Sequence, residues 1–133
     1  MPDAQPHHYE CWIRWSDVDA YGHVNNVNYF EYFQEARIRA MRDAVAGDNL
    51  GFVVARVVVD YKRPLFFRSE PYDIETRATR LGNSSFDLTA AIVDDEKSLA
   101  VSRTTVVAFD GSSQRSRALT SAEADGVRSI LVT

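Results

Sequence analysis

One change in hydrophobic period constrains the fold of this 133-residue chain more than any other feature. Between residues 29 and 41, apolar side chains recur at helical spacing, which predicts an amphipathic helix with one broad apolar face. Between residues 53 and 109 the period becomes two, which predicts four consecutive strands joined by turns. A helix followed by such strands indicates an α+β fold, in which an antiparallel sheet packs its apolar face on the helix.

Local signals set the expected limits of the helix. Residues 8–15 alternate enough to form a strand before it. Asn25 and Asn26 are good N-cap residues, because a short side-chain oxygen can accept a hydrogen bond from the first free N–H groups, so we expect the helix to begin there. Gly47 supplies the expected stop.

Two further signals concern the strands and the end of the chain. Residues 53, 55, 57, 59 and 61 are expected to share one face of a long strand. Pro64 has no N–H to donate, so we expect this strand to be bulged near its end. Thr120 and Glu123 match a capping box, which predicts a short terminal helix.

The composition is that of an ordinary globular protein, with 45% hydrophobic and 26% charged residues. We expect a single domain over residues 1–133, because the chain has no repeat or linker. The net charge of −4 argues against partners such as nucleic acid or an anionic membrane. No stretch approaches the length of a membrane span and the start lacks a signal-peptide pattern, so the expected location is cytoplasmic.

The cysteine and histidine content argues against disulfides and metals. Cys11 is the single cysteine, and no Cys/His grouping has zinc-ligand spacing. We therefore expect no metal and no cofactor.

The long, valine-rich strands would expose pairing edges, which predicts a dimer with a continuous sheet.

Polar residues are densest in the segment from Asp17 to Tyr29, just before the predicted helix. A carboxylate there would lie beside helix N–H groups that carry partial positive charge, which suits a carbonyl oxygen gaining negative charge. The alternative is purely structural. Asp17 and Asp19 would then form Asx turns, and Asn25 or Asn26 would only cap the helix.

The order Asp17-x-Asp19-x-x-Gly22-His23-Val24-Asn25-Asn26-x-x-Tyr29, followed by Glu35-Ala36-Arg37, resembles the signature of a known family. These are the hotdog-fold acyl-CoA thioesterases of the 4-hydroxybenzoyl-CoA thioesterase type, and the segment is also similar to plant acyl-acyl-carrier-protein thioesterases. The resemblance implies a curved antiparallel sheet wrapped round one long central helix. It also implies a homodimer or homotetramer with active sites between subunits.

The resemblance assigns roles residue by residue. Asp19 would be the catalytic acid, acting as nucleophile or as general base. The backbone N–H of Asn26 would polarise the thioester carbonyl, and His23 would orient Asp19, bond the backbone or help in proton transfer. Asp17 is expected to form a turn. Substrate binding is expected at Tyr29, Val59, Tyr61, Lys62, Arg63, Asn83, Ser84 and Ser85, the last three contributed by the partner subunit or its neighbour.

The expected activity is hydrolysis of an acyl-CoA thioester to free acid and coenzyme A. Two alternatives stay open: a non-catalytic acyl-CoA binding module, and a thioesterase acting on acyl carrier protein. The second arises because Gly82-Asn83-Ser84 stands where one lineage of the family has basic residues. An enoyl-CoA hydratase is disfavoured, because the residues around Asp19 and His23 do not resemble that motif.

Overall fold

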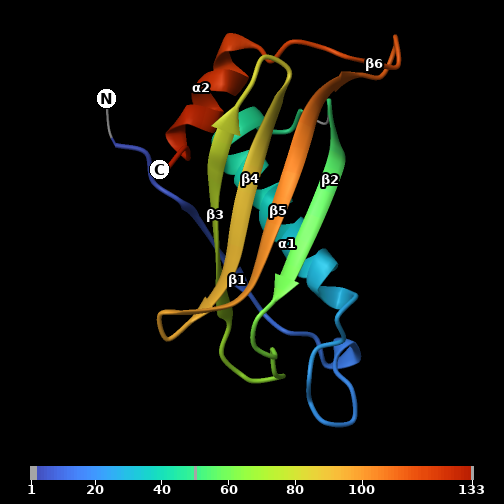
Figure 1. The fold of residues 1–133 in the computed structure, drawn as a ribbon, viewed down its shortest axis with the longest axis vertical. Coiled ribbons are helices and arrows are strands. Elements are labelled where there is room, and N and C mark those ends of the chain that lie inside the picture. Colours follow the sequence, from blue (N-terminus) through green and yellow to red (C-terminus); the bar gives the residue numbers. More distant parts are fainter. Residues whose placement is uncertain (1–2, 50, 133) are drawn as a thin grey trace.

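The computed structural model describes residues 3–49 and 51–132. One long helix lies against one face of an antiparallel sheet, which confirms the α+β class (Figure 1). In chain order the elements are β1 (His7–Cys11), the short helix η1 (Trp15–Asp17), α1 (Asn28–Ala40), the π-helical turn η2 (Met41–Ala46), β2 (Phe52–Tyr61), β3 (Tyr72–Leu81), β4 (Ser85–Asp94), β5 (Lys97–Asp110), β6 (Arg115–Ser116) and α2 (Ser121–Ser129). Residues 1–2, 50 and 133 lie outside the described residues. They are part of the expected single domain, and residues 1–2 are also part of the start that lacks a signal-peptide pattern.

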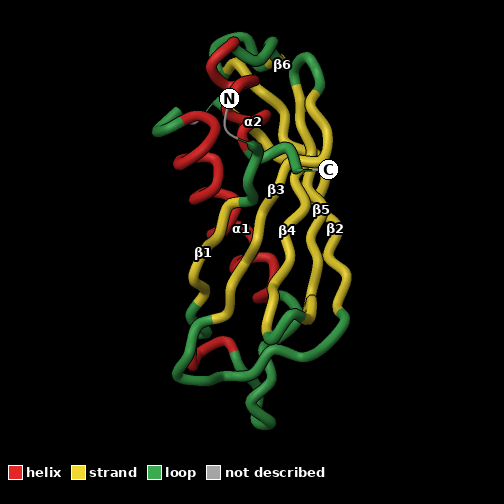
Figure 2. Tube along the Cα trace, turned by 90° about the vertical axis from the view of Figure 1, so that its left-hand side faces the viewer, coloured by secondary structure: helices red, strands yellow, loops and turns green. Residues whose placement is uncertain are grey.

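The sheet has the strand order β1-β3-β4-β5-β2, and β6 pairs with β5 beside it. Each neighbouring pair is antiparallel. α1 packs against β1, β3 and β4, so the sheet curves past the helix and leaves β2 as an open edge (Figure 2). Within the described residues, no helix is long and apolar enough to span a bilayer.

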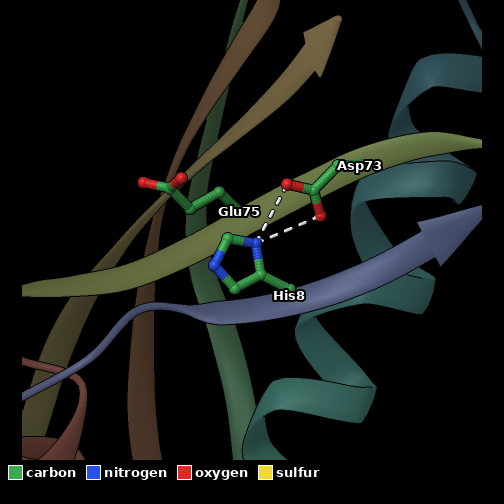
Figure 3. Close-up of side chains that lie close together, drawn as sticks. All are labelled: His8, Asp73 and Glu75. Carbon is green, nitrogen blue, oxygen red and sulfur yellow. Dashed lines mark hydrogen bonds and ion pairs between the residues drawn. The ribbon is translucent and has the colours of Figure 1, made fainter. Parts of the chain in front are cut away.

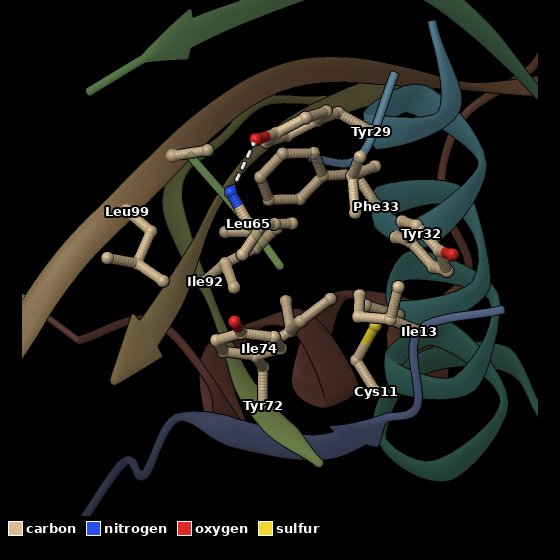
Figure 4. Packing of buried hydrophobic residues seen from close by; sticks show 14 residues of the cluster. Cys11, Ile13, Tyr29, Tyr32, Phe33, Leu65, Tyr72, Ile74, Ile92 and Leu99 are labelled. Atoms are coloured by element: carbon tan, nitrogen blue, oxygen red, sulfur yellow. Dashed lines mark hydrogen bonds between the residues drawn. The ribbon is translucent and has the colours of Figure 1, made fainter. Parts of the chain in front are cut away.

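The core lies between α1 and the inner face of the sheet, in two clusters. Figure 4 shows the first, in which Tyr29 and Phe33 of α1 meet Ile74 and Ile92 of β3 and β4, with Leu65 beside them. The second lies under α2 and includes Phe86 and Val127. The predicted alternation of the strands is confirmed, because inward-facing residues such as Ile74, Phe86 and Ile92 have no exposed surface.

The terminal helix begins at the predicted capping box. The backbone N–H of Glu123 donates to the Thr120 hydroxyl at 3.1 Å, and the backbone N–H of Thr120 donates to the Glu123 carboxylate at 2.9 Å. Arg117 donates to both oxygens of the same carboxylate, at 2.8 and 3.1 Å, and holds the pKa of Glu123 down at about 2. A buried ion pair therefore fixes α2 to the end of the sheet.

Two expected helix and strand limits are wrong. β1 ends at Cys11 instead of continuing to residue 15, because the chain turns into η1. α1 begins at Asn28, not at Asn25 or Asn26. The side-chain oxygen of Asn25 accepts from the N–H of Val27 at 3.2 Å, and its backbone oxygen accepts from Asn28 at 2.9 Å, so Asn25 caps a turn that precedes the helix. The stop at Gly47 is confirmed, with φ at +57°.

The bulge of β2 lies between Val54 and Arg56, near the start of the strand and not near its end. It inserts one residue, which reverses the side of the sheet to which later residues point. Val53 pairs with Val107 and Val57 with Thr104, three residues away on β5, so Val53 and Val57 lie on opposite faces. The expectation that residues 53, 55, 57, 59 and 61 share one face is wrong for this reason, because the bulge separates residue 53 from residues 57, 59 and 61.

Candidate active site

A cleft of about 520 Å³ opens where the loop before α1 meets the segment after β2. The chain brings seven predicted site residues together in its lining, contributed by two segments far apart in sequence. They are Asp19, His23, Asn26, Tyr29, Tyr61, Lys62 and Arg63, joined by Val24, Asn25 and Pro64. Tyr61 is the last residue of β2, so the cleft lies beside this end of the strand. Figure 1 shows where β2 finishes in the sheet.

Main-chain hydrogen bonds join the two walls of the cleft. The N–H of Val24 donates to the Leu65 oxygen at 2.9 Å, and that of Phe67 donates to the Gly22 oxygen at 3.1 Å. Gly22 has φ at +80°, a conformation that favours glycine, which explains this residue in the loop. The loop that carries Asp19 is therefore held by the 65–67 segment, whose contribution the sequence reasoning missed.

The carboxylate of Asp19 is fixed through one of its two oxygens. Oδ1 accepts from the backbone N–H groups of Tyr21 at 2.9 Å and His23 at 3.1 Å. Oδ2 makes no hydrogen bond with any of the described residues, and the residue is exposed at the cleft. Asp19 therefore forms the Asx turn of the structural interpretation and also keeps one oxygen available for chemistry.

The ring of His23 does not touch Asp19 through a hydrogen bond in the described structure. It packs edge-on against Phe66, with ring centroids 4.8 Å apart, and lies 6.5 Å from the Tyr21 ring. The backbone of His23 carries the contact with Asp19, because its N–H donates to the carboxylate and its oxygen accepts from the Asp19 N–H at 2.8 Å. His23 thus orients Asp19 through the main chain.

Asn26 lies in the turn that leads into α1, where N–H groups carry partial positive charge. Its backbone N–H has no acceptor among residues 3–49 and 51–132. Its backbone oxygen accepts from the Tyr61 hydroxyl at 2.8 Å, which ties the turn to the end of β2. A free N–H at this place can polarise a carbonyl oxygen.

Two tyrosines form the floor of the cleft. The Tyr61 ring packs edge-on against the Tyr29 ring, with centroids 4.9 Å apart. The Tyr29 hydroxyl accepts from the N–H of Leu65 at 3.0 Å, and burial raises the pKa of Tyr29, which keeps that hydroxyl protonated near neutral pH. Tyr29 is only 2% exposed, so it supports the cleft from within the core.

Asp17 is more than a turn former. It is 9% exposed, and its Oδ2 accepts from the Tyr32 hydroxyl at 2.6 Å and from Nε of Arg14 at 2.8 Å. Arg14 also pairs with Glu31 and Glu35 of α1. Burial and the hydrogen bond to Asp17 raise the pKa of Tyr32. This network anchors the loop to α1, and no motif spacing indicates it, because its members come from η1, from the loop before it and from α1.

Four predicted residues lie outside the cleft of the single chain. Val59 lies on β2 and packs against the core. The hairpin residues Asn83, Ser84 and Ser85 lie at the opposite end of the sheet, where the backbone oxygen of Asn83 accepts from Leu119 at 2.9 Å. One chain does not bring these three residues to Asp19.

A curled antiparallel sheet around one long helix is the architecture of the hotdog-fold thioesterases. The model of the family "Thioesterase-like superfamily" matches residues 13–125. The chain belongs to this family, which confirms the resemblance noted in its sequence, and it is a thioester hydrolase.

Three similar proteins support this assignment. The chain is 28% identical over 114 residues to the long-chain acyl-CoA thioesterase FadM of Escherichia coli K12, covering 80% of this chain and 86% of FadM. It is 25% identical over 105 residues to a putative esterase of Aquifex aeolicus, covering 74% and 81%. A thioesterase of Thermus thermophilus, solved with coenzyme A and Zn, superposes with a TM-score of 0.81 at 30% identity over 93% of this chain and 92% of that one.

Proposed function

We propose that this thioesterase hydrolyses acyl-CoA to free acid and coenzyme A, with Asp19 as the catalytic group. One observation carries the proposal: Asp19 and Asn26 line the same cleft, and among the described residues Oδ2 of Asp19 and the N–H of Asn26 have no hydrogen-bond partner. A thioester is already a reactive acyl group, so one carboxylate and one polarised carbonyl can suffice without a serine–histidine pair.

The proposed reaction begins with the thioester oxygen at the N–H of Asn26, where developing negative charge is stabilised. Oδ2 of Asp19 then removes a proton from a water whose oxygen attacks the carbonyl carbon. The C–S bond breaks, and the proton moves to the sulfur of coenzyme A. Alternatively, Oδ2 attacks the carbon itself and water hydrolyses the resulting anhydride. Single turnover in H₂¹⁸O tests the second route. If water attacks the aspartyl carbon of the anhydride, the product carries away ¹⁶O from Asp19 and Asp19 retains ¹⁸O, an exchange that the first route cannot produce.

The rim of the cleft suits the carrier part of the substrate. Lys62 and Arg63 line it and carry positive charge, which suits the phosphates of coenzyme A. The FadM relative is a long-chain acyl-CoA thioesterase, and the Thermus thioesterase binds coenzyme A, so we favour coenzyme A over acyl carrier protein. The proposed compartment is the cytoplasm, in keeping with one free, buried cysteine.

The proposed assembly is a homodimer that pairs β2 with β2 of a second copy. Val53 and Val54 on this open edge are 42% and 45% exposed, and Phe30 and Ile38 on the neighbouring flank of α1 are 44% and 49% exposed. A groove of about 450 Å³ lies between these two surfaces. An unpaired edge flanked by apolar side chains favours a second copy as its partner.

Antiparallel pairing of two β2 strands would complete the site. The end of β2 at Tyr61 would then lie beside the start of the partner's β2, where the groove opens at Phe52. The bound acyl group would extend from the cleft of one chain into the groove of the other. In each chain the hairpin 83–85 lies at the end of the sheet where β2 starts. The partner's hairpin would therefore approach the nucleotide part of the substrate. A homotetramer would add a second such dimer.

Thiol release from a panel of acyl-CoAs tests the proposal. Wild type should turn over at least one substrate, while Asp19→Ala and Asp19→Asn should lose about 10²-fold or more of kcat, with the fold intact. Asp125→Asn is the matched control, because Asp125 is an exposed carboxylate on α2, away from the cleft. Full activity in both Asp19 variants would refute the assignment, and binding without turnover in wild type would make the chain a binding module.

A further inference from the structure

A second group of chemically active side chains lies on the outer face of the sheet, at its β1 edge. β1 and β3 are paired so that His8 stands directly opposite Glu75, and Glu10 opposite Asp73. Directly opposed residues share a face, and residues two apart on one strand also share it. Ile74, between the two acids, has no exposed surface, so this face is the one turned away from the core.

Three of these side chains lie close together in Figure 3. Nδ1 of His8 lies 2.9 and 3.2 Å from the two carboxylate oxygens of Asp73, and Glu75 projects from the same strand beside the ring. One ligand atom from each of His8, Asp73 and Glu75 lies within 4.8 Å of the others. The register of two paired strands holds them together, so the arrangement rests on the main-chain ladder.

The carboxylates of this group form no ion pair with lysine or arginine among the described residues. Among the ion pairs of the described residues, Asp73 pairs only with His8, and neither Glu10 nor Glu75 has a partner. Other acids on the same face, such as Asp60 and Asp87, are paired with arginine. A patch with carboxylates and one imidazole therefore faces solvent, and Arg77, two residues beyond Glu75 on the same face, forms no ion pair with it among the described residues.

We propose that His8, Asp73 and Glu75 bind a divalent transition-metal ion. An imidazole nitrogen with two carboxylate oxygens is a donor set that zinc and its neighbours in the first transition row accept, whereas calcium and magnesium prefer oxygen donors alone. The three ligands would occupy one side of the ion and leave the outer side to water. Glu10 stands on the same face, opposite Asp73, and is positioned to supply a further oxygen.

The bound ion would fasten β1 to the sheet. β1 is held by five residue pairs with β3, and the chain continues from it through η1 into the loop that carries Asp19. An ion that binds only the folded state stabilises that state by linkage. Spacing in the sequence does not reveal this group, because His8 and Asp73 are 65 residues apart.

The test is titration of tag-free protein with Zn²⁺. Calorimetry should find one ion per chain with a dissociation constant in the micromolar range, and the thermal midpoint should rise by roughly 5–10 °C at a 100-fold excess over that constant. His8→Ala and Glu75→Gln should each weaken binding at least tenfold and remove the thermal shift. His7→Gln is the matched control, because the ring of the adjacent His7 forms a hydrogen bond with Asp43 instead. This variant should keep both the Zn²⁺ affinity and the thermal shift of wild type.

A second readout locates the ion. Paramagnetic Co²⁺ should broaden the amide signals of residues 8, 73 and 75 before those of residues 18–27. The proposal is overturned if Zn²⁺ does not bind at 1 mM, if His8→Ala binds as tightly as wild type, or if the broadening centres on His23. Metal-free wild type and His8→Ala should hydrolyse thioester equally, so failure here leaves the assignment of Asp19 unaffected.

Discussion

Replacing Tyr32 by phenylalanine removes one oxygen atom from the network that anchors the loop carrying Asp19. The Tyr32 hydroxyl donates to the Asp17 carboxylate at 2.6 Å and accepts from the backbone N–H of Arg14 at 3.0 Å. The ring stays, so its packing in the core and its contact with the Arg14 guanidinium, 4.6 Å from the ring centroid, are retained. The variant therefore isolates two hydrogen bonds.

The expected loss in the free energy of unfolding follows from the hydrogen bonds that Asp17 and Arg14 lose and keep. Asp17 remains 9% exposed and retains Arg14 as its strongest partner, so its carboxylate loses a hydrogen bond of the charged class, about 1.5–3 kcal/mol. The N–H of Arg14 loses a neutral bond of about 0.5–1.5 kcal/mol. We expect the free energy of unfolding to fall by about 2–4 kcal/mol.

Equilibrium unfolding in urea measures this change, at one fixed protein concentration because the proposed dimer makes stability depend on concentration. Tyr21→Phe is the control, since Tyr21 is 85% exposed and should change stability by less than about 0.5 kcal/mol. A loss in Tyr32→Phe no larger than that of the control would refute the view that Asp17 anchors the loop through Tyr32.

Three further changes probe other parts of the molecule. Arg117 lowers the pKa of Glu123 to about 2, so their ion pair contributes stability that is complete above the ordinary glutamate pKa and is lost as the pH falls from about 4.5 towards 2. Glu123→Gln should therefore lower the free energy of unfolding by on the order of 2 kcal/mol at pH 7. The difference from wild type should be smaller in unfolding curves at pH 3. In Gly126→Ala, the added methyl would meet backbone atoms of the adjoining turn closer than 3.0 Å, so thermal unfolding should show a loss of roughly 1–3 kcal/mol, whereas Gly111→Ala, with nothing within 4 Å, should not. Val54→Lys places a charge on the open edge of β2, and light scattering should then find monomers where wild type gives dimers, while an unchanged dimer would exclude this edge as the interface.

Local patterns were enough for the fold class, whereas the candidate catalytic loop was assigned by the resemblance of a short motif to a known family. The helix and the strands are predicted by hydrophobic periods of 3.6 and 2 residues, which depend only on neighbours along the chain. The loop residues Asp19, His23 and Asn26 lie within eight positions of one another, so a short motif contains them. That motif and the end of β2 meet in one cleft of the single chain.

Tertiary structure decided what depends on contacts between distant segments. The bulge at Val54 and Arg56 changes which residues of β2 face the core, and it arises from pairing with β5. The burial of Asp17 depends on Arg14 and Tyr32, and the cluster at His8 depends on the register of β1 against β3. Such pairings are set by the packing of the whole sheet on α1, because a shift of one residue in register turns every side chain of a strand to the other face.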